Sequence, residues 1–96
     1  MQYAHYKKAL AIREKVFRPE HPDVADSLNH IAGILSTQGR YKEAELLYKR
    51  ALLIDEKVYG QGHPRVSKSL SNLASNYLAQ GQYNEAESIF KRVLKI

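Results

Sequence analysis

The 96-residue sequence repeats itself with a period of 42 residues, and this internal repeat restricts the fold more than any other feature. When the chain is aligned with itself at that offset, 24 of the 54 residue pairs are identical. His21 is matched by His63 and Gly39 by Gly81. Periods of roughly 20–50 residues are typical of solenoids, in which a unit buries its apolar face only against its neighbours. We therefore expect a stack of repeated units.

Within each unit the apolar residues recur at the spacing of a helix. Val24, Leu28 and Ile31 are separated by steps of four and three, which place side chains on one helical face. A second stripe of this kind follows Gly39, and no segment alternates long enough to form a strand. Pro22 suits a first helical turn, and Gly39 suits the left-handed residue that ends a helix. The pattern predicts five helices, at 2–16, 22–38, 41–58, 64–80 and 83–95.

The predicted helices alternate between two types, which we name A and B, in the order B-A-B-A-B. This order predicts an all-α fold, an α-α superhelical solenoid that forms one domain over residues 1–96. The domain consists of a half repeat at 1–16 and two repeats at 22–58 and 64–96. Because the first helix B has no helix A before it, we interpret the chain as a fragment of a longer array.

These motifs resemble the tetratricopeptide repeat. Helix A carries small and apolar residues such as Ala32, the turn carries Gly39, and helix B carries Ala44, Tyr48 and Ala51. The period of 42, longer than the usual repeat of about 34, is similar to that of kinesin light chains and nephrocystin-like proteins. The resemblance implies a cytoplasmic protein-interaction module whose A helices line a concave groove and bind a linear peptide segment of a partner.

The resemblance also implies which residues form the groove. The implied peptide-binding residues are Asp26, Asn29, His30, Gly33, Lys68, Ser71, Asn72 and Asn76. Asparagine suits this role because one amide both donates and accepts hydrogen bonds, and so can hold a peptide backbone. Asp26 lies on the first helix A, whereas Arg65 and Lys68 lie on the second. We expect this polarised groove to place acidic residues of the peptide beside Arg65 and Lys68.

Several other functions are excluded by composition. The absence of cysteine excludes thiolate metal sites and cysteine nucleophiles, and no serine or glycine motif for catalysis or phosphate binding is present. We therefore predict neither an enzyme nor a cofactor or metal site. The repeated His21 and His63 each precede a proline, which favours a structural role at a helix entry.

Charge and hydropathy argue against nucleic acids and membranes as partners. The net charge of +5 lies mainly on the B helices, where basic residues alternate with acids, as is typical of a solvated surface. No apolar run reaches the ~18 residues of a membrane-spanning helix.

The sequence leaves a structural role open beside peptide binding. The repeats could act as a spacer in a larger signalling or motor-adaptor protein, or could associate head to tail through uncapped ends. The helix B stripes at these ends consist of His5, Ala9 and Ile12 at one end and Ile89, Val93 and Ile96 at the other.

Overall fold

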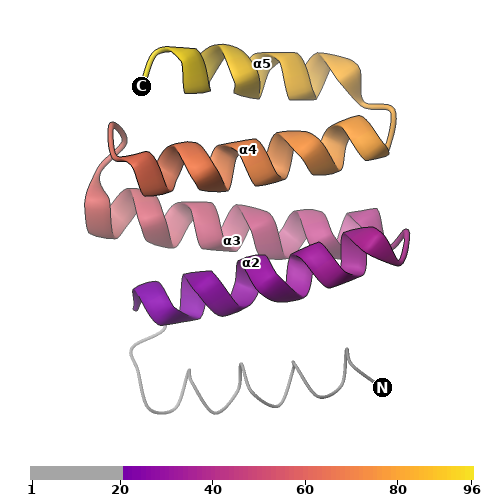
Figure 1. Ribbon diagram of the computed structural model, residues 1–96, viewed down its shortest axis with the longest axis horizontal. Coiled ribbons are helices and arrows are strands. Elements are labelled where there is room, and N and C mark those ends of the chain that lie inside the picture. Colours follow the sequence, from indigo (N-terminus) through magenta and orange to yellow (C-terminus); the bar gives the residue numbers. More distant parts are fainter. Residues whose placement is uncertain (1–20) are drawn as a thin grey trace.

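The computed structural model describes residues 21–96, which form four α-helices and no strand (Figure 1). The helices are α2 (Pro22–Thr37), α3 (Tyr41–Tyr59), α4 (Pro64–Ala79) and α5 (Tyr83–Leu94). Each predicted helix in this part of the chain is confirmed, with bounds that agree to within one residue. The predicted count of five is not matched by these four helices, because the predicted helix at 2–16 lies outside the described residues.

Consecutive helices run antiparallel and lie side by side in chain order (Figure 1). The helix α3 packs against both α2 and α4, and α5 packs against α4. The two A helices, α2 and α4, also contact each other directly, although 42 residues separate their equivalent positions. This contact places two A helices next to each other along one side of the stack. The predicted helix-pair solenoid is confirmed over the described residues.

The turns between helices of a pair use the same backbone motif in both repeats. Gly39 and Gly81 have positive φ angles of 79° and 78°, in the left-handed region that favours glycine. One residue later, the Arg40 N–H donates to the Leu35 carbonyl at 2.8 Å, which closes a Schellman motif. The predicted role of the two glycines is therefore confirmed.

The repeated histidines cap the A helices. The Nδ1 atom of His21 accepts a hydrogen bond from the Asp23 N–H at 3.0 Å, and His63 Nδ1 accepts one from the Arg65 N–H at 3.1 Å. Each ring thus satisfies a backbone donor that the first helical turn would otherwise leave without a partner. The predicted helix-entry role of both residues is confirmed.

Replacing His63 with Ala should lower the free energy of unfolding by about 1 kcal/mol, because it removes the cap of α4. The replacement His63→Asn should retain most of this stability, since its side-chain oxygen can accept the same bond. Urea denaturation of the three proteins measures the difference. If His63→Asn costs as much as His63→Ala, the stacking of His63 on the Tyr59 ring, 4.6 Å away, is the dominant contribution instead.

The core consists of the apolar stripes that the sequence predicts. One cluster joins α2 and α3, and a larger one extends through all four helices. Ala44 and Ala86 are fully buried where a helix B meets its helix A, and their small size permits the close approach. The helix B stripe is less buried on α5 than on α3: Phe90 is 37% exposed whereas its repeat equivalent Tyr48 is 7% exposed, because α5 packs against α4 alone among the described helices.

Among residues 21–96, no helix has both the length and the apolar character that crossing a membrane requires.

Candidate functional site

Two adjoining cavities lie along the side of the molecule where α2 and α4 meet. The first, which we name the polar pocket, has a volume of about 390 Å³ and is lined by Asp26, Asn29, His30, Asp55, Arg65, Lys68, Ser69 and Asn72. The second has a volume of about 450 Å³ and is lined by Asn29, His30, Gly33, Ile34, Thr37, Gln38, Tyr48 and Asn72. Asn29, His30 and Asn72 line both cavities, which therefore adjoin, and we name the two cavities together the groove.

The structure brings most of the predicted groove residues together. Six of the eight line the two cavities, namely Asp26, Asn29, His30, Gly33, Lys68 and Asn72. Ser71 is half-buried and lines neither cavity. Asn76 is 2% exposed, and its Nδ2 donates to the Tyr41 carbonyl at 3.0 Å. Its amide thus connects α4 to the first turn of α3 and does not face the groove.

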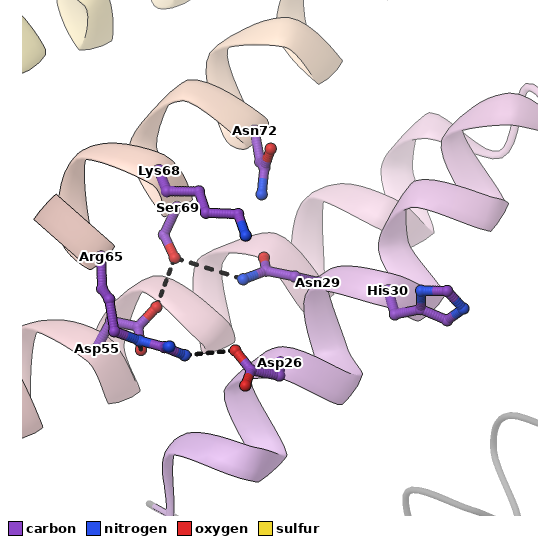
Figure 2. A pocket seen from close by; sticks show the side chains of 8 residues that line it. All are labelled: Asp26, Asn29, His30, Asp55, Arg65, Lys68, Ser69 and Asn72. Atoms are coloured by element: carbon purple, nitrogen blue, oxygen red, sulfur yellow. Dashed lines mark hydrogen bonds and ion pairs between the residues drawn. The ribbon is translucent and has the colours of Figure 1, made fainter.

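The floor of the polar pocket is a hydrogen-bonded network that joins three helices (Figure 2). Ser69 Oγ on α4 donates to Asp55 Oδ2 on α3 at 2.6 Å, and Asn29 Nδ2 on α2 donates to Ser69 Oγ at 3.4 Å. Asp55 and Ser69 are 2% and 1% exposed, so both lie beneath the groove surface. Such a network fixes the relative positions of α2, α3 and α4.

Arg65 crosses the groove to pair with the opposite helix. Its guanidinium is hydrogen-bonded to Asp26 Oδ1, and its Nε lies 3.8 Å from Asp55 Oδ1 (Figure 2). The Arg65 side chain also lies over the Tyr59 ring, 5.1 Å from its centroid. Burial acts to lower the pKa of Arg65, but the hydrogen bond and charge of Asp26, with smaller contributions from Tyr59 and Asp55, raise that pKa overall.

The expected charge polarity of the groove stays a prediction, but two of the residues on which it rests, Asp26 and Arg65, form an ion pair with each other. Lys68 remains exposed at the rim and has no ion-pair partner among the described residues. Among the basic residues that line the polar pocket, Lys68 is therefore the one whose charge is not paired with a carboxylate of the described residues.

Asp55 and Ser69 are the pocket residues that the sequence analysis missed. The charged residues of the B helices were expected together on a solvated surface, whereas the structure buries Asp55 against Ser69 of α4. A signal for this burial exists in the sequence, because Asp55 follows Ala51 by four residues and Tyr48 by seven. An acid at these steps lies on the apolar stripe and needs a polar partner there.

The polar pocket combines acidic and basic side chains. Within the part of the chain that the structure describes, no three side chains of the types His, Cys, Asp and Glu gather at one point. The carboxylates of Asp26 and Asp55 are instead accompanied by the cationic side chains of Arg65 and Lys68.

Comparison with solved structures agrees with this architecture. The chain superposes on BtubC (BKLC) from P. vanneervenii with a TM-score of 0.91 and 26% sequence identity, over 98% of this chain and 37% of that one. It superposes on two structures of the nearly identical TPR-like repeats of a Podosopora anserina protein assigned as a kinesin light chain. These have TM-scores of 0.83 and 0.82, at 29% identity, over 97% of this chain and 44% of the other. The chain thus spans less than half the length of these neighbours.

The family of the chain is identified by comparing its sequence with models of known protein families. None of the curated proteins compared is significantly similar to the chain. The family model of the tetratricopeptide repeat matches residues 3–57 and again residues 31–96. These two matches include all four described helices, and the helix pairs, turn glycines and A-helix groove have the arrangement that the repeat requires. The chain therefore belongs to the tetratricopeptide repeat family, and its structural neighbours include kinesin light chain-like members.

Proposed function

We propose that the chain is a protein-interaction module whose groove between α2 and α4 binds a linear segment of a partner protein. Tetratricopeptide repeats generally serve as non-enzymatic scaffolds for contacts between proteins, which supports this assignment. The observation that carries it is the groove itself, in which Asn29 of one A helix and Lys68 and Asn72 of the other line the polar pocket.

The groove offers different contacts along its length. Asn72 can donate to and accept from a peptide backbone, because no hydrogen bond within the described residues occupies its amide. Lys68 at the rim favours an acidic residue of the ligand. The second cavity adds apolar surface from Ile34 and the Tyr48 ring. Since an exposed charge pair contributes only about 0.2–1 kcal/mol, hydrogen bonding and apolar contact should provide most of the affinity.

Selection of peptides from a random-sequence display library on the immobilised chain tests the proposal. Against acidic peptides selected in this way, Lys68→Glu should weaken binding by about fivefold, equivalent to about 1 kcal/mol, and should flatten the salt dependence. Asn72→Ala should weaken peptides of any charge, because it removes a contact to the backbone. Isothermal titration calorimetry at two salt concentrations measures both effects.

A matched charge reversal at a lysine that lines neither cavity provides the control. Lys91 on α5 is 70% exposed and, within residues 21–96, pairs only with the exposed Glu87, at 3.2 Å. The variant Lys91→Glu should leave peptide affinity nearly unchanged. If Lys91→Glu weakens binding while Lys68→Glu and Asn72→Ala do not, the ligand lies outside the groove.

Self-association is a second candidate function, which the outer side of α5 favours. Leu94 and Phe90 on α5 are 86% and 37% exposed, and Ile96, which follows the helix, is 44% exposed, so this end of the stack presents apolar surface to solvent. The complementary surface expected for head-to-tail contact, at His5, Ala9 and Ile12, lies outside the described residues. Analytical ultracentrifugation at rising concentration should show species larger than the monomer. A monomer that persists to about millimolar concentration would contradict this second function.

A further inference from the structure

The second cavity contains the hydroxyl of a buried tyrosine that has no hydrogen-bond partner. Tyr48 on α3 lines this cavity and is 7% exposed, and its ring belongs to the cluster that extends through all four described helices. Within residues 21–96, no group forms a hydrogen bond with the Tyr48 hydroxyl. Because buried tyrosine hydroxyls usually have a partner, this one has an unused capacity to bind a ligand.

The hydroxyl retains contact with solvent although the ring is buried. Seven described side-chain atoms are both unpaired and sealed from solvent, and the Tyr48 oxygen is not one of them. Since this oxygen is unpaired but not sealed, it has surface that a group in the cavity can contact. Asp55 Oδ1 and Arg65 Nε, beneath the polar pocket, belong to the sealed atoms and offer no such surface.

Gly33 on α2 leaves the hydroxyl uncovered. A Cβ atom placed on Gly33 would lie 3.7 Å from the Tyr48 oxygen, so the hydroxyl lies close to the surface of α2 at this residue. Gly33 and Tyr48 line the same cavity. Because glycine has no side chain, a ligand can approach α2 closely here. A larger side chain at position 33 would occupy the space beside the oxygen.

The Tyr48 hydroxyl can act as a hydrogen-bond donor. Burial raises the pKa of the Tyr48 phenol, so the hydroxyl keeps its hydrogen at neutral pH. The other hydroxyl that lines the cavity, Thr37 Oγ1, donates to the Gly33 carbonyl at 2.9 Å. Of the two, Tyr48 is therefore the one whose hydrogen is available. The matching acceptor is a carbonyl oxygen, which every residue of a peptide main chain carries.

The repeat does not require this hydroxyl. The residue equivalent to Tyr48 in the next repeat is Phe90, so α5 forms with a ring that has no hydroxyl. The residue equivalent to Gly33 is Ser75. The combination of an uncovered hydroxyl and a facing glycine thus occurs in the pair α2 and α3 and not in the pair α4 and α5.

We propose that the main chain of the peptide ligand passes over Gly33 and that one of its carbonyl oxygens accepts a hydrogen bond from the Tyr48 hydroxyl. This inference rests on the proposed function and deepens it, since it adds a helix B residue to the groove contacts and states which part of the ligand that residue binds. Asn72 lines the same cavity and can bind an adjacent part of the main chain.

Tyr48→Phe tests the hydrogen bond, because it removes the oxygen and keeps the ring in the core. By calorimetry it should weaken peptides selected from the display library by about three- to tenfold, irrespective of their sequences. Tyr77→Phe is the matched control, since Tyr77 is 8% exposed and lines neither cavity. An equal loss in Tyr77→Phe, or a loss limited to peptides that share one polar side chain, would overturn the inference.

Gly33→Leu tests the close approach and leaves Tyr48 unchanged. Leucine is the better helix former, so the urea midpoint of this variant should be no lower than that of the unaltered chain. Its side chain should nevertheless weaken peptide binding by more than Tyr48→Phe does. Ser75→Leu, at the exposed equivalent position that lines neither cavity, is the control and should leave affinity unchanged. Unchanged affinity in Gly33→Leu would overturn the inference.

An ester scan of one selected peptide locates the carbonyl group. Replacement of a single amide by an ester makes its carbonyl a weaker acceptor. One ester should weaken binding to the unaltered chain more than the others do, and the same ester should cause no further loss in Tyr48→Phe. Equal effects of that ester in the two proteins would overturn the inference.

The groove variants separate this inference from the proposed function. If Asn72→Ala weakens binding and Tyr48→Phe does not, the inference is overturned and the proposed function remains. If no selected peptide binds in the groove, the proposed function fails and the inference fails with it.

Discussion

Replacement of Leu70 by Ala should lower the free energy of unfolding by about 2–5 kcal/mol. Leu70 is 1% exposed and belongs to the cluster that extends through all four described helices. Its truncation leaves a cavity that the flanking helices cannot fill without loss of their own contacts. Because small domains have total stabilities of about 5–15 kcal/mol, this variant should lose a large fraction of its stability. Urea denaturation followed by circular dichroism measures the change.

Leu46→Ala makes the same chemical change at a position where no cavity can form. Leu46 lies on α3 and is 69% exposed. We expect this control to alter the free energy of unfolding by less than about 0.5 kcal/mol. If the two variants are equally destabilised, α4 does not occupy the centre of the stack.

Removal of Arg65 alone should destabilise the chain strongly, because it leaves the Asp55 carboxylate buried without a cation. We expect Arg65→Met to cost about 3 kcal/mol, at the low end of the range for breaking a buried pair, since the Arg65 side chain remains 35% exposed. The double variant Arg65→Met with Asp55→Leu should recover most of this loss, because it removes both charges and fills the space with apolar groups. Thermal denaturation of the single and double variants measures the coupling.

Two results would contradict the interpretation that Arg65 compensates the buried charge of Asp55. If Arg65→Met is nearly neutral, the pair between Arg65 and the two carboxylates does not connect α2, α3 and α4. If the double variant is less stable than Arg65→Met, the Ser69–Asp55 hydrogen bond is more important than the ion pair.

The fold could be predicted from the sequence because its signals are local and occur twice. The steps of three and four between apolar residues specify helical faces, and Gly39 and Gly81 mark the same turn in both repeats. The two histidine caps were predictable for the same reason, since each stands directly before the proline that begins a helix. A pattern of apolar residues in one segment can arise by chance, but the same pattern found twice, 42 residues apart, indicates a repeated structural unit.

The groove was predicted in outline, but its chemistry was not. Asn29 and Asn72 line the cavities, as the family resemblance implies. The environment of Asp55 and Asn76 depends on which neighbouring helix covers them, and helical spacing alone does not specify that neighbour. The pairing of Arg65 with Asp26 likewise joins residues 39 positions apart in the chain. Cross-repeat contacts of this kind determine which polar groups remain available to a ligand.

The central claim is that a peptide binds between α2 and α4, and NMR mapping tests it most directly. Amide chemical shifts of the ¹⁵N-labelled chain are recorded with and without a peptide selected from the display library. The account predicts that the largest changes occur at Asn29, His30 and Asn72, which line both cavities. Changes confined to residues that line neither cavity, such as Leu46 on α3 and Lys91 on α5, would contradict it.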